Sequence, residues 1–173
     1  MSTHLYVLTG ASRGMGLAMA HQLLHPGHSL ICISRKASAE LAQAARDADV
    51  PLAQWTLDLA DGEAASERLR SWLQAQALGQ WQQATLINNA AAMPRIAPLA
   101  QSHAHELATV LRVGLEAPMQ LTAAFLGATE NWGVPRKVLN ISSGLGRKAM
   151  ASQSAYCAVK AGMDHFTRCL ALE

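Results

Sequence analysis

The sequence is poor in charged and aromatic residues, and it has no long apolar run. Charged residues make up 15% of the 173 residues, aromatic residues 5%, and the formal net charge is +2. A nucleic-acid-binding protein would be expected to cluster basic residues on one face, whereas here Lys and Arg are scattered. No stretch approaches the roughly 18 apolar residues of a membrane-spanning helix, and no basic segment opens the chain ahead of an apolar one. These absences predict a cytoplasmic protein with no nucleic-acid partner and no membrane partner.

Cysteine and histidine are too few or too scattered to suggest a disulfide or a metal site. Cys32, Cys157 and Cys169 lack CxxC spacing and are odd in number, so we expect reduced packing residues. Only His103 and His105 lie close together among seven histidines, and residues two apart do not share a helix face. The sequence therefore predicts no metal site and places both histidines in a polar connection.

Short β-rich runs alternate with longer segments rich in Ala, Leu and Gln. This alternation predicts parallel strands joined by helices that cover both faces of the sheet. We expect strands at 5–10, 28–34, 51–59, 84–90 and 136–143. We expect helices at 15–24, 40–48, 62–77, 103–126 and from 154 onward, with Pro118 either kinking the fourth or lying where its geometry is relaxed. The predicted fold is one α/β domain over 1–173, a Rossmann-type doubly wound parallel sheet in three layers.

A glycine-rich turn follows the first expected strand and opens the first expected helix. Glycine lets the backbone turn sharply and lets a pyrophosphate approach the helix amino terminus, where free N–H groups attract anions. A bare tight turn could use the same residues, so the motif alone leaves both readings open. The candidate cofactor residues in this turn are Gly10, Ser12, Arg13, Gly14, Met15 and Gly16.

The end of the second expected strand bears on the choice between NAD and NADP. An NAD site needs a carboxylate there for the ribose hydroxyls, whereas an NADP site needs cations for the 2′-phosphate. Arg35 follows Ser34 at this place, and no acid occurs before Glu40. Arg13 could reach the same phosphate. A solvated strand end is the alternative, but the pattern favours NADP(H).

A serine, a tyrosine and a lysine follow in order near the end of the sequence. Ser143 closes the fifth expected strand, Tyr156 lies thirteen residues later, and Lys160 follows by four. Residues four apart share a helix face, so the ammonium can stand near the phenol. A free phenol has a pKa of about 10, and a neighbouring cation favours the phenolate, which suits proton transfer to a developing alkoxide. Each residue also has an ordinary explanation, such as chance helical spacing or a turn.

In combination these motifs resemble the short-chain dehydrogenase/reductase family, and most of all its sepiapterin reductase and benzil reductase branch. The family motifs here are "TGASRGMG", "DL" at 58–59, "NNAA" at 88–91, "NISS" at 140–143 and "YCAVK" at 156–160. The resemblance implies an NADP(H)-dependent oxidoreductase that reduces a ketone or diketone carbonyl of a small molecule. It makes Tyr156 the general acid, Lys160 its modulator and ribose ligand, and Ser143 the partner of the substrate oxygen. It also implies a homodimer or homotetramer and further cofactor contacts from Asp58, Leu59, Asn89, Ala90 and Ala91.

The sequence departs from the family pattern in three places. Ala91 stands where the family has Gly, and Gly114 stands where it has an Asn that bends a helix and holds a water of the proton relay. Family members also usually continue beyond the catalytic helix with further strands and a substrate-covering segment, so the implied fold is truncated. These departures keep two alternatives open: a degenerate member that binds nucleotide or a partner without turnover, and a redox-inert structural subunit.

Overall fold

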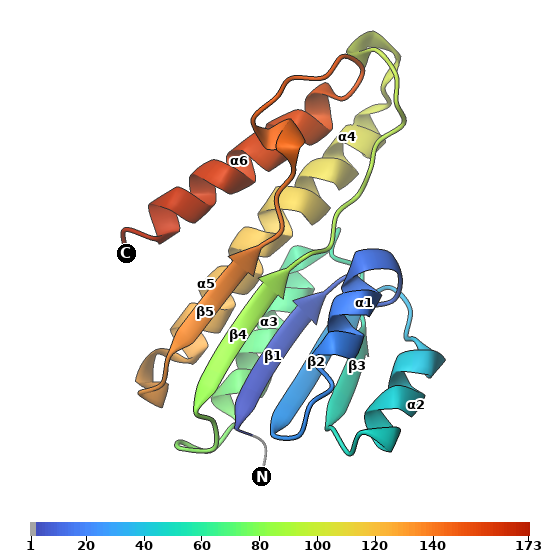
Figure 1. Cartoon of the computed structure of the whole chain (residues 1–173). Coiled ribbons are helices and arrows are strands. Elements are labelled where there is room, and N and C mark those ends of the chain that lie inside the picture. Colours follow the sequence, from blue (N-terminus) through green and yellow to red (C-terminus); the bar gives the residue numbers. More distant parts are fainter. Residues whose placement is uncertain (1–2) are drawn as a thin grey trace.

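The computed structural model describes residues 3–173 and contains one parallel sheet between two helical layers (Figure 1). The strands are β1 (His4–Thr9), β2 (His28–Ser34), β3 (Leu52–Thr56), β4 (Gln83–Asn88) and β5 (Arg136–Asn140). They lie in the order β3-β2-β1-β4-β5, and every pair is parallel. The order reverses between β1 and β4, so the carboxyl ends of these two strands open the crevice where such sheets bind ligands.

Helices cover both faces of the sheet, as the sequence predicts. Those assigned are α1 (Gly14–Gln22), α2 (Ala39–Asp47), α3 (Gly62–Gln74), α4 (Ala104–Leu111), α5 (Ala117–Ala128) and α6 (Ser154–Leu170). Ala20 of α1 and Leu41 of α2 pack with Leu8 and Leu30 on one face. Residues of α3 and α5 pack on the other face, among them the fully buried Phe125. In residues 3–173 no helix combines the length and apolar character that crossing a membrane requires.

The segment predicted as one helix over 103–126 is broken by a π-helical turn. Residues Arg112–Glu116 form this π segment between α4 and α5, and Gly114 lies buried at its centre. Pro118 lies in the first turn of α5, directly after this π segment. Proline has no N–H to donate to the carbonyl four residues earlier, that of Gly114, so the interruption of the helix and the proline lie together.

Two predicted strands, β3 and β5, end three residues earlier than expected, and a polar side chain begins a turn after each. Asp58 accepts a hydrogen bond from the Ala60 N–H at 3.0 Å, just past the end of β3. Ser143 accepts one from the Leu145 N–H at 3.2 Å and opens a short 3₁₀ helix, Gly144–Gly146. Such local bonds compete with a strand ladder and favour turns at these positions.

The expectation that all three cysteines are packing residues holds for Cys32, which is buried, but is wrong for Cys169, which is exposed; Cys157 is half-buried. Burial raises the pKa of the Cys32 thiol to about 12, so this thiol stays protonated at neutral pH. His103 precedes α4, and its ring lies 5.7 Å from that of His105 in a stacked arrangement. Across residues 3–173, no group of three or more His, Cys, Asp or Glu side chains is placed to hold a metal ion.

Candidate active site and cofactor cleft

The glycine turn between β1 and α1 folds closely on itself. Gly10 and Gly14 have φ angles of +74° and +56°, in the left-handed region that favours glycine. A Cβ on Gly16 would lie 2.1 Å from the Gly10 carbonyl oxygen, and one on Gly10 would lie 3.0 Å from the Ala90 Cα. The backbone at this end of the crevice must therefore stay bare.

The amino terminus of α1 opens directly from this turn. Among the described residues no side chain caps the helix, and its first turn contains no acid. The free N–H groups and the positive end of the helix dipole are therefore available to an anion. Ser12 is half-buried at this point, and Arg13 and Met15 are exposed beside it. These features fit the pyrophosphate of a dinucleotide.

Thr9 and Asn89 tie the carboxyl ends of β1 and β4 together. The Thr9 hydroxyl accepts hydrogen bonds from the N–H groups of Asn89 at 2.9 Å and Ala90 at 3.0 Å. The Asn89 side-chain amide donates to the Thr9 carbonyl at 2.9 Å. Ala91 follows at the surface. Sequence reasoning missed Thr9, although a polar residue that ends an apolar strand just before the glycine turn was a usable signal.

The carboxyl ends of β2 and β3 form the other flank of the cleft. Arg35 is exposed immediately after β2, and the buried Ser34 hydroxyl has no partner in the part of the chain that the structure describes. Asp58 is exposed after β3, whereas Leu59 is buried. The Leu57 N–H donates to the Ser34 carbonyl at 3.0 Å and joins the two strand ends. An exposed cation beside an unpaired hydroxyl offers hydrogen-bond donors to a polar or anionic ligand at this flank.

Lys160 and Tyr156 meet on α6, as their spacing predicts. Lys160 is only 3% exposed, and its Nζ donates to the Ile141 carbonyl at 2.7 Å. The same Nζ lies 5.7 Å from the centroid of the Tyr156 ring. Burial lowers the pKa of Lys160, and the Asp164 carboxylate one turn later acts in the opposite direction. The chain thus holds a desolvated ammonium beside a half-buried phenol.

Ser143 lies on the turn that packs against this part of α6. Its Oγ accepts from Leu145, which leaves the hydroxyl hydrogen free to be donated. Further along the turn, a Cβ on Gly146 would lie 3.0 Å from the Lys160 carbonyl carbon. The turn that carries Ser143 therefore rests on the backbone of α6 at Lys160.

A line of polar side chains fastens α6 to the sheet. The Asn88 side-chain amide donates to the Asn140 Oδ1 at 2.8 Å and to the Thr122 hydroxyl at 3.2 Å. Asn140 in turn donates to the Thr167 hydroxyl of α6 at 2.9 Å. This network connects β4, β5, α5 and α6, so α6 is anchored to the two strands that end at the crevice.

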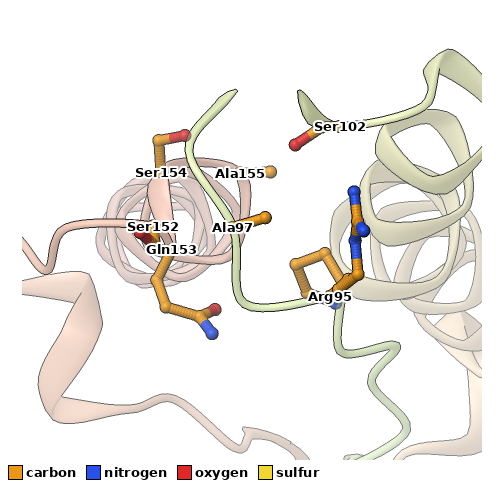
Figure 2. Close-up of a pocket in the computed structure, with 8 residues that line it drawn as sticks. Arg95, Ala97, Ser102, Ser152, Gln153, Ser154 and Ala155 are labelled. Atoms are coloured by element: carbon orange, nitrogen blue, oxygen red, sulfur yellow. The ribbon is translucent and has the colours of Figure 1, made fainter. Parts of the chain in front are cut away.

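A small polar recess lies at the start of α6. Figure 2 shows Arg95 and Ser102, from the loop after β4, across from Ser152, Gln153 and Ser154. Its volume is about 10 Å³, which is room for about one water. The Gln153 Oε1 is buried and has no hydrogen-bond partner among residues 3–173.

Sequence relatives of this chain are reductases. The family model described as short chain dehydrogenase matches residues 4–173. Benzil reductase ((S)-benzoin forming) of Bacillus cereus is 34% identical over 167 residues, which cover 96% of this chain and 67% of the relative. Sepiapterin reductase of Xenopus tropicalis is 32% identical over 181 residues, which cover 98% of this chain and 68% of the relative.

Solved structures agree with this relationship. A short-chain dehydrogenase/reductase from Burkholderia vietnamiensis superposes with a TM-score of 0.86 at 33% identity, covering 98% of this chain and 77% of that one. A metagenomic short-chain oxidoreductase in complex with NADP superposes with a TM-score of 0.86 at 27% identity, covering 98% and 74%. The chain therefore belongs to the short-chain dehydrogenase/reductase family of oxidoreductases, in which it is most similar to the benzil reductase and sepiapterin reductase branch.

Proposed function

We propose that the chain forms the nucleotide-binding and catalytic part of an NADP(H)-dependent reductase that converts a ketone or diketone to an alcohol. The observation that carries the proposal is the buried Lys160 ammonium, held by the Ile141 carbonyl beside the Tyr156 ring. Burying a cation costs free energy unless the charge is paired and hydrogen-bonded. Groups with perturbed pKa values of this kind concentrate at functional sites. The names of the benzil and sepiapterin reductase relatives support the carbonyl substrate.

NADPH, when bound, supplies the hydride that adds to the carbonyl carbon. The glycine turn and the amino terminus of α1 would hold its pyrophosphate, and Arg35 with Arg13 would hold the 2′-phosphate. The unpaired Ser34 hydroxyl at the end of β2 supports a polar ligand there. The remaining contacts, to the adenine, the adenosine side of the cleft and the nicotinamide ribose, would come from Asp58, Leu59, Asn89, Ala90, Ala91, Tyr156 and Lys160.

Tyr156 would donate its phenolic proton to the carbonyl oxygen. The Tyr156 O–H bond breaks as the O–H bond of the product alcohol forms, and the phenolate that remains is stabilised by the Lys160 ammonium. Because burial lowers the pKa of Lys160, this ammonium can return a proton to the phenolate more easily than an exposed lysine could. Ser143 would donate its free hydroxyl hydrogen to the same oxygen and orient the substrate.

The sequence pattern supports one nucleotide-binding domain over residues 1–173, located in the cytoplasm. The family resemblance supports a homodimer or homotetramer.

Replacing Tyr156 tests the proposed chemistry. In Tyr156→Phe we expect kcat for diketone reduction to fall about 10²- to 10⁴-fold, because the general acid is lost, while NADPH still binds. Tyr6→Phe is the matched control, since Tyr6 lies on β1 and its ring contacts His28 instead. NADPH oxidation would be followed at 340 nm in the presence of a panel of diketones, and NADPH binding by fluorescence. A kcat in Tyr156→Phe equal to that of the wild type would exclude Tyr156 as the general acid.

The alternative is a member that binds nucleotide without turnover. Gly114 favours this alternative, because glycine offers no side chain to a proton relay at that position. Folded wild-type protein that binds NADPH and reduces no carbonyl in the panel would establish the alternative.

A further inference from the structure

The π segment and α6 fit into one another through two glycines. A Cβ on Gly114 would lie 2.6 Å from the Val159 Cγ1, and a Cβ on Gly162 would lie 3.1 Å from the Leu115 Cδ2. Each element thus presents bare backbone to a branched side chain of the other. Gly114 and Leu115 belong to the π segment, and Val159 and Gly162 belong to α6, so the contact is reciprocal.

Val159 has little freedom to move away from Gly114. It is 1% exposed, and a β-branched side chain in a helix has one strongly preferred rotamer. An added methyl group at 114 could therefore be accommodated only if the two elements moved apart. Protein interiors are close-packed, so an added methyl group forces neighbouring elements to shift.

The contact lies directly beside the catalytic pair. Val159 precedes Lys160 in the chain and lies three residues after Tyr156, so a shift of α6 here displaces both functional side chains. The Lys160 Nζ would move with it relative to the Ile141 carbonyl, its hydrogen-bond partner at 2.7 Å. π-Helical turns inside helices occur frequently at functional sites, and this one borders the buried lysine.

We propose that Val159 is a positioning residue of the active site: by packing on the bare backbone of Gly114 it sets the distance between α6 and the π segment. This proposal rests on the proposed function, because the distance matters through the placement of Tyr156 and Lys160. It also means that valine at 159 and any side chain at 114 exclude one another. An asparagine at 114, the residue that the family resemblance implies, requires a smaller residue at 159.

Three Gly→Ala substitutions test the steric argument. Helix propensity favours alanine at Gly114, Gly162 and Gly127, so propensity alone predicts no loss at any of them. Sterics predict a graded series, because the nearest atom to the added Cβ is 2.6 Å away at 114, 3.1 Å at 162 and 3.8 Å at 127. The atom at 127 is the Nη1 end of Arg70, which can move, so Gly127→Ala is the matched control.

Activity should follow this order. We expect kcat of the folded enzyme to fall by about 10²-fold in Gly114→Ala, since a misplacement of about 1 Å can cost that much. Gly162→Ala should lose less, and Gly127→Ala should keep wild-type kcat. NADPH should still bind all three variants because the glycine turn is not touched, with a smaller loss of affinity than of kcat where Lys160, its proposed ribose ligand, is displaced. Measuring kcat well below the unfolding temperature separates mispositioning from a loss of folded protein.

Second-site rescue distinguishes positioning from general damage. Val159→Ala should restore most of the kcat lost in Gly114→Ala or Gly114→Asn, because it removes the methyl groups that the new side chain meets. If Gly114→Ala does not fold, the double variant with Val159→Ala should fold and turn over. Wild-type kcat in Gly114→Ala, or the absence of rescue by Val159→Ala, would overturn the proposal.

Failure of the proposed function would be visible separately. If the wild type turns over no carbonyl, the reductase proposal fails. The steric contact between Val159 and Gly114 is then tested by the unfolding temperature, which should fall most in Gly114→Ala and recover in the double variant Gly114→Ala/Val159→Ala. An unfolding temperature that falls less in Gly114→Ala than in Gly127→Ala would reject this steric contact, whatever the activity.

Discussion

The proposed cofactor end of the crevice, around Gly10 and Gly16, has bare backbone, whereas the proposed catalytic end, around α6, has closely packed side chains. Around Gly10 and Gly16 an added Cβ meets a backbone atom, the nearest being the Gly10 carbonyl oxygen at 2.1 Å. Around α6 the functional groups are held by side chains, through Val159 on Gly114 and through the Asn140 to Thr167 hydrogen bond. Backbone contacts thus fix the geometry at one end, and side-chain contacts fix it at the other.

This difference predicts how each end tolerates change. A backbone atom cannot be replaced, so a clash with it has no second-site remedy. A side chain can be replaced, so a clash at the catalytic end can be relieved by a compensating substitution. The cofactor end should therefore be intolerant of substitution, and the catalytic end should tolerate paired substitutions.

The largest expected effect is that of Gly16→Ala. The added methyl would overlap the Gly10 carbonyl oxygen, so the glycine turn must open and NADPH binding should be lost. Fluorescence titration with NADPH, together with thermal unfolding, measures both consequences.

Gly133→Ala is the control, because its φ is +67° and no atom lies within 4 Å of its added Cβ. It should lose only about 1–2 kcal/mol of stability for the left-handed backbone and still bind NADPH. Unchanged NADPH affinity in Gly16→Ala would remove the contrast between the two ends.

Arg35→Ala should have the next largest effect and should distinguish the two cofactors. A hydrogen bond to a charged group contributes about 1.5–3 kcal/mol, so NADPH affinity should fall about 10- to 100-fold while NADH affinity changes little. Lys137→Ala removes an exposed cation from β5, away from the end of β2, and should change neither affinity. Equal losses for NADPH and NADH would show that Arg35 does not bind the 2′-phosphate.

The smallest effect concerns pH and the buried lysine. Burial lowers the pKa of Lys160 below its ordinary 10.5, so as pH rises the folded protein loses this proton before the unfolded chain does. Below the folded-state pKa the protein bears the cost of a buried charge, and that cost is relieved as pH rises toward 10.5. Wild type should therefore gain stability relative to Lys160→Met over this window.

Urea unfolding of both proteins at several pH values between neutral and 10.5 measures this gain. A difference in unfolding free energy that stays constant with pH would mean that the Lys160 ammonium is not desolvated. Lys160 would then be as well solvated as the exposed Arg13 and Arg35 at the other end of the crevice.

Local pattern was sufficient for most of the fold. The apolar runs predicted the positions of β1, β2 and β4, and the glycine turn predicted the start of α1. The spacing of Tyr156 and Lys160 placed them on one helix face because the helical period is a local property. The candidate roles of these residues remain predictions, which the experiments above test.

Contacts between distant residues were not accessible from pattern. Thr9 bonds to Asn89 across 80 residues, and nothing near Thr9 in the sequence indicates that partner. The Ile141 carbonyl that holds Lys160 is a backbone group, so its residue type carries no signal. The resemblance marked position 114 as one where the helix bends, but the π-helical turn and its packing partner Val159 were not predicted, because Val159 lies on another helix.

The sequence by itself determined the elements, the parallel sheet and the set of candidate residues, because hydrophobic period, glycine freedom and helix spacing all act over a few residues. Only the tertiary structure decided how those residues are held. It buried Lys160, joined β1 to β4 through Thr9 and packed Val159 on Gly114. The physical reason is that desolvation and steric contact depend on which distant atoms come within a few ångströms, and that is set by the packing of the whole chain.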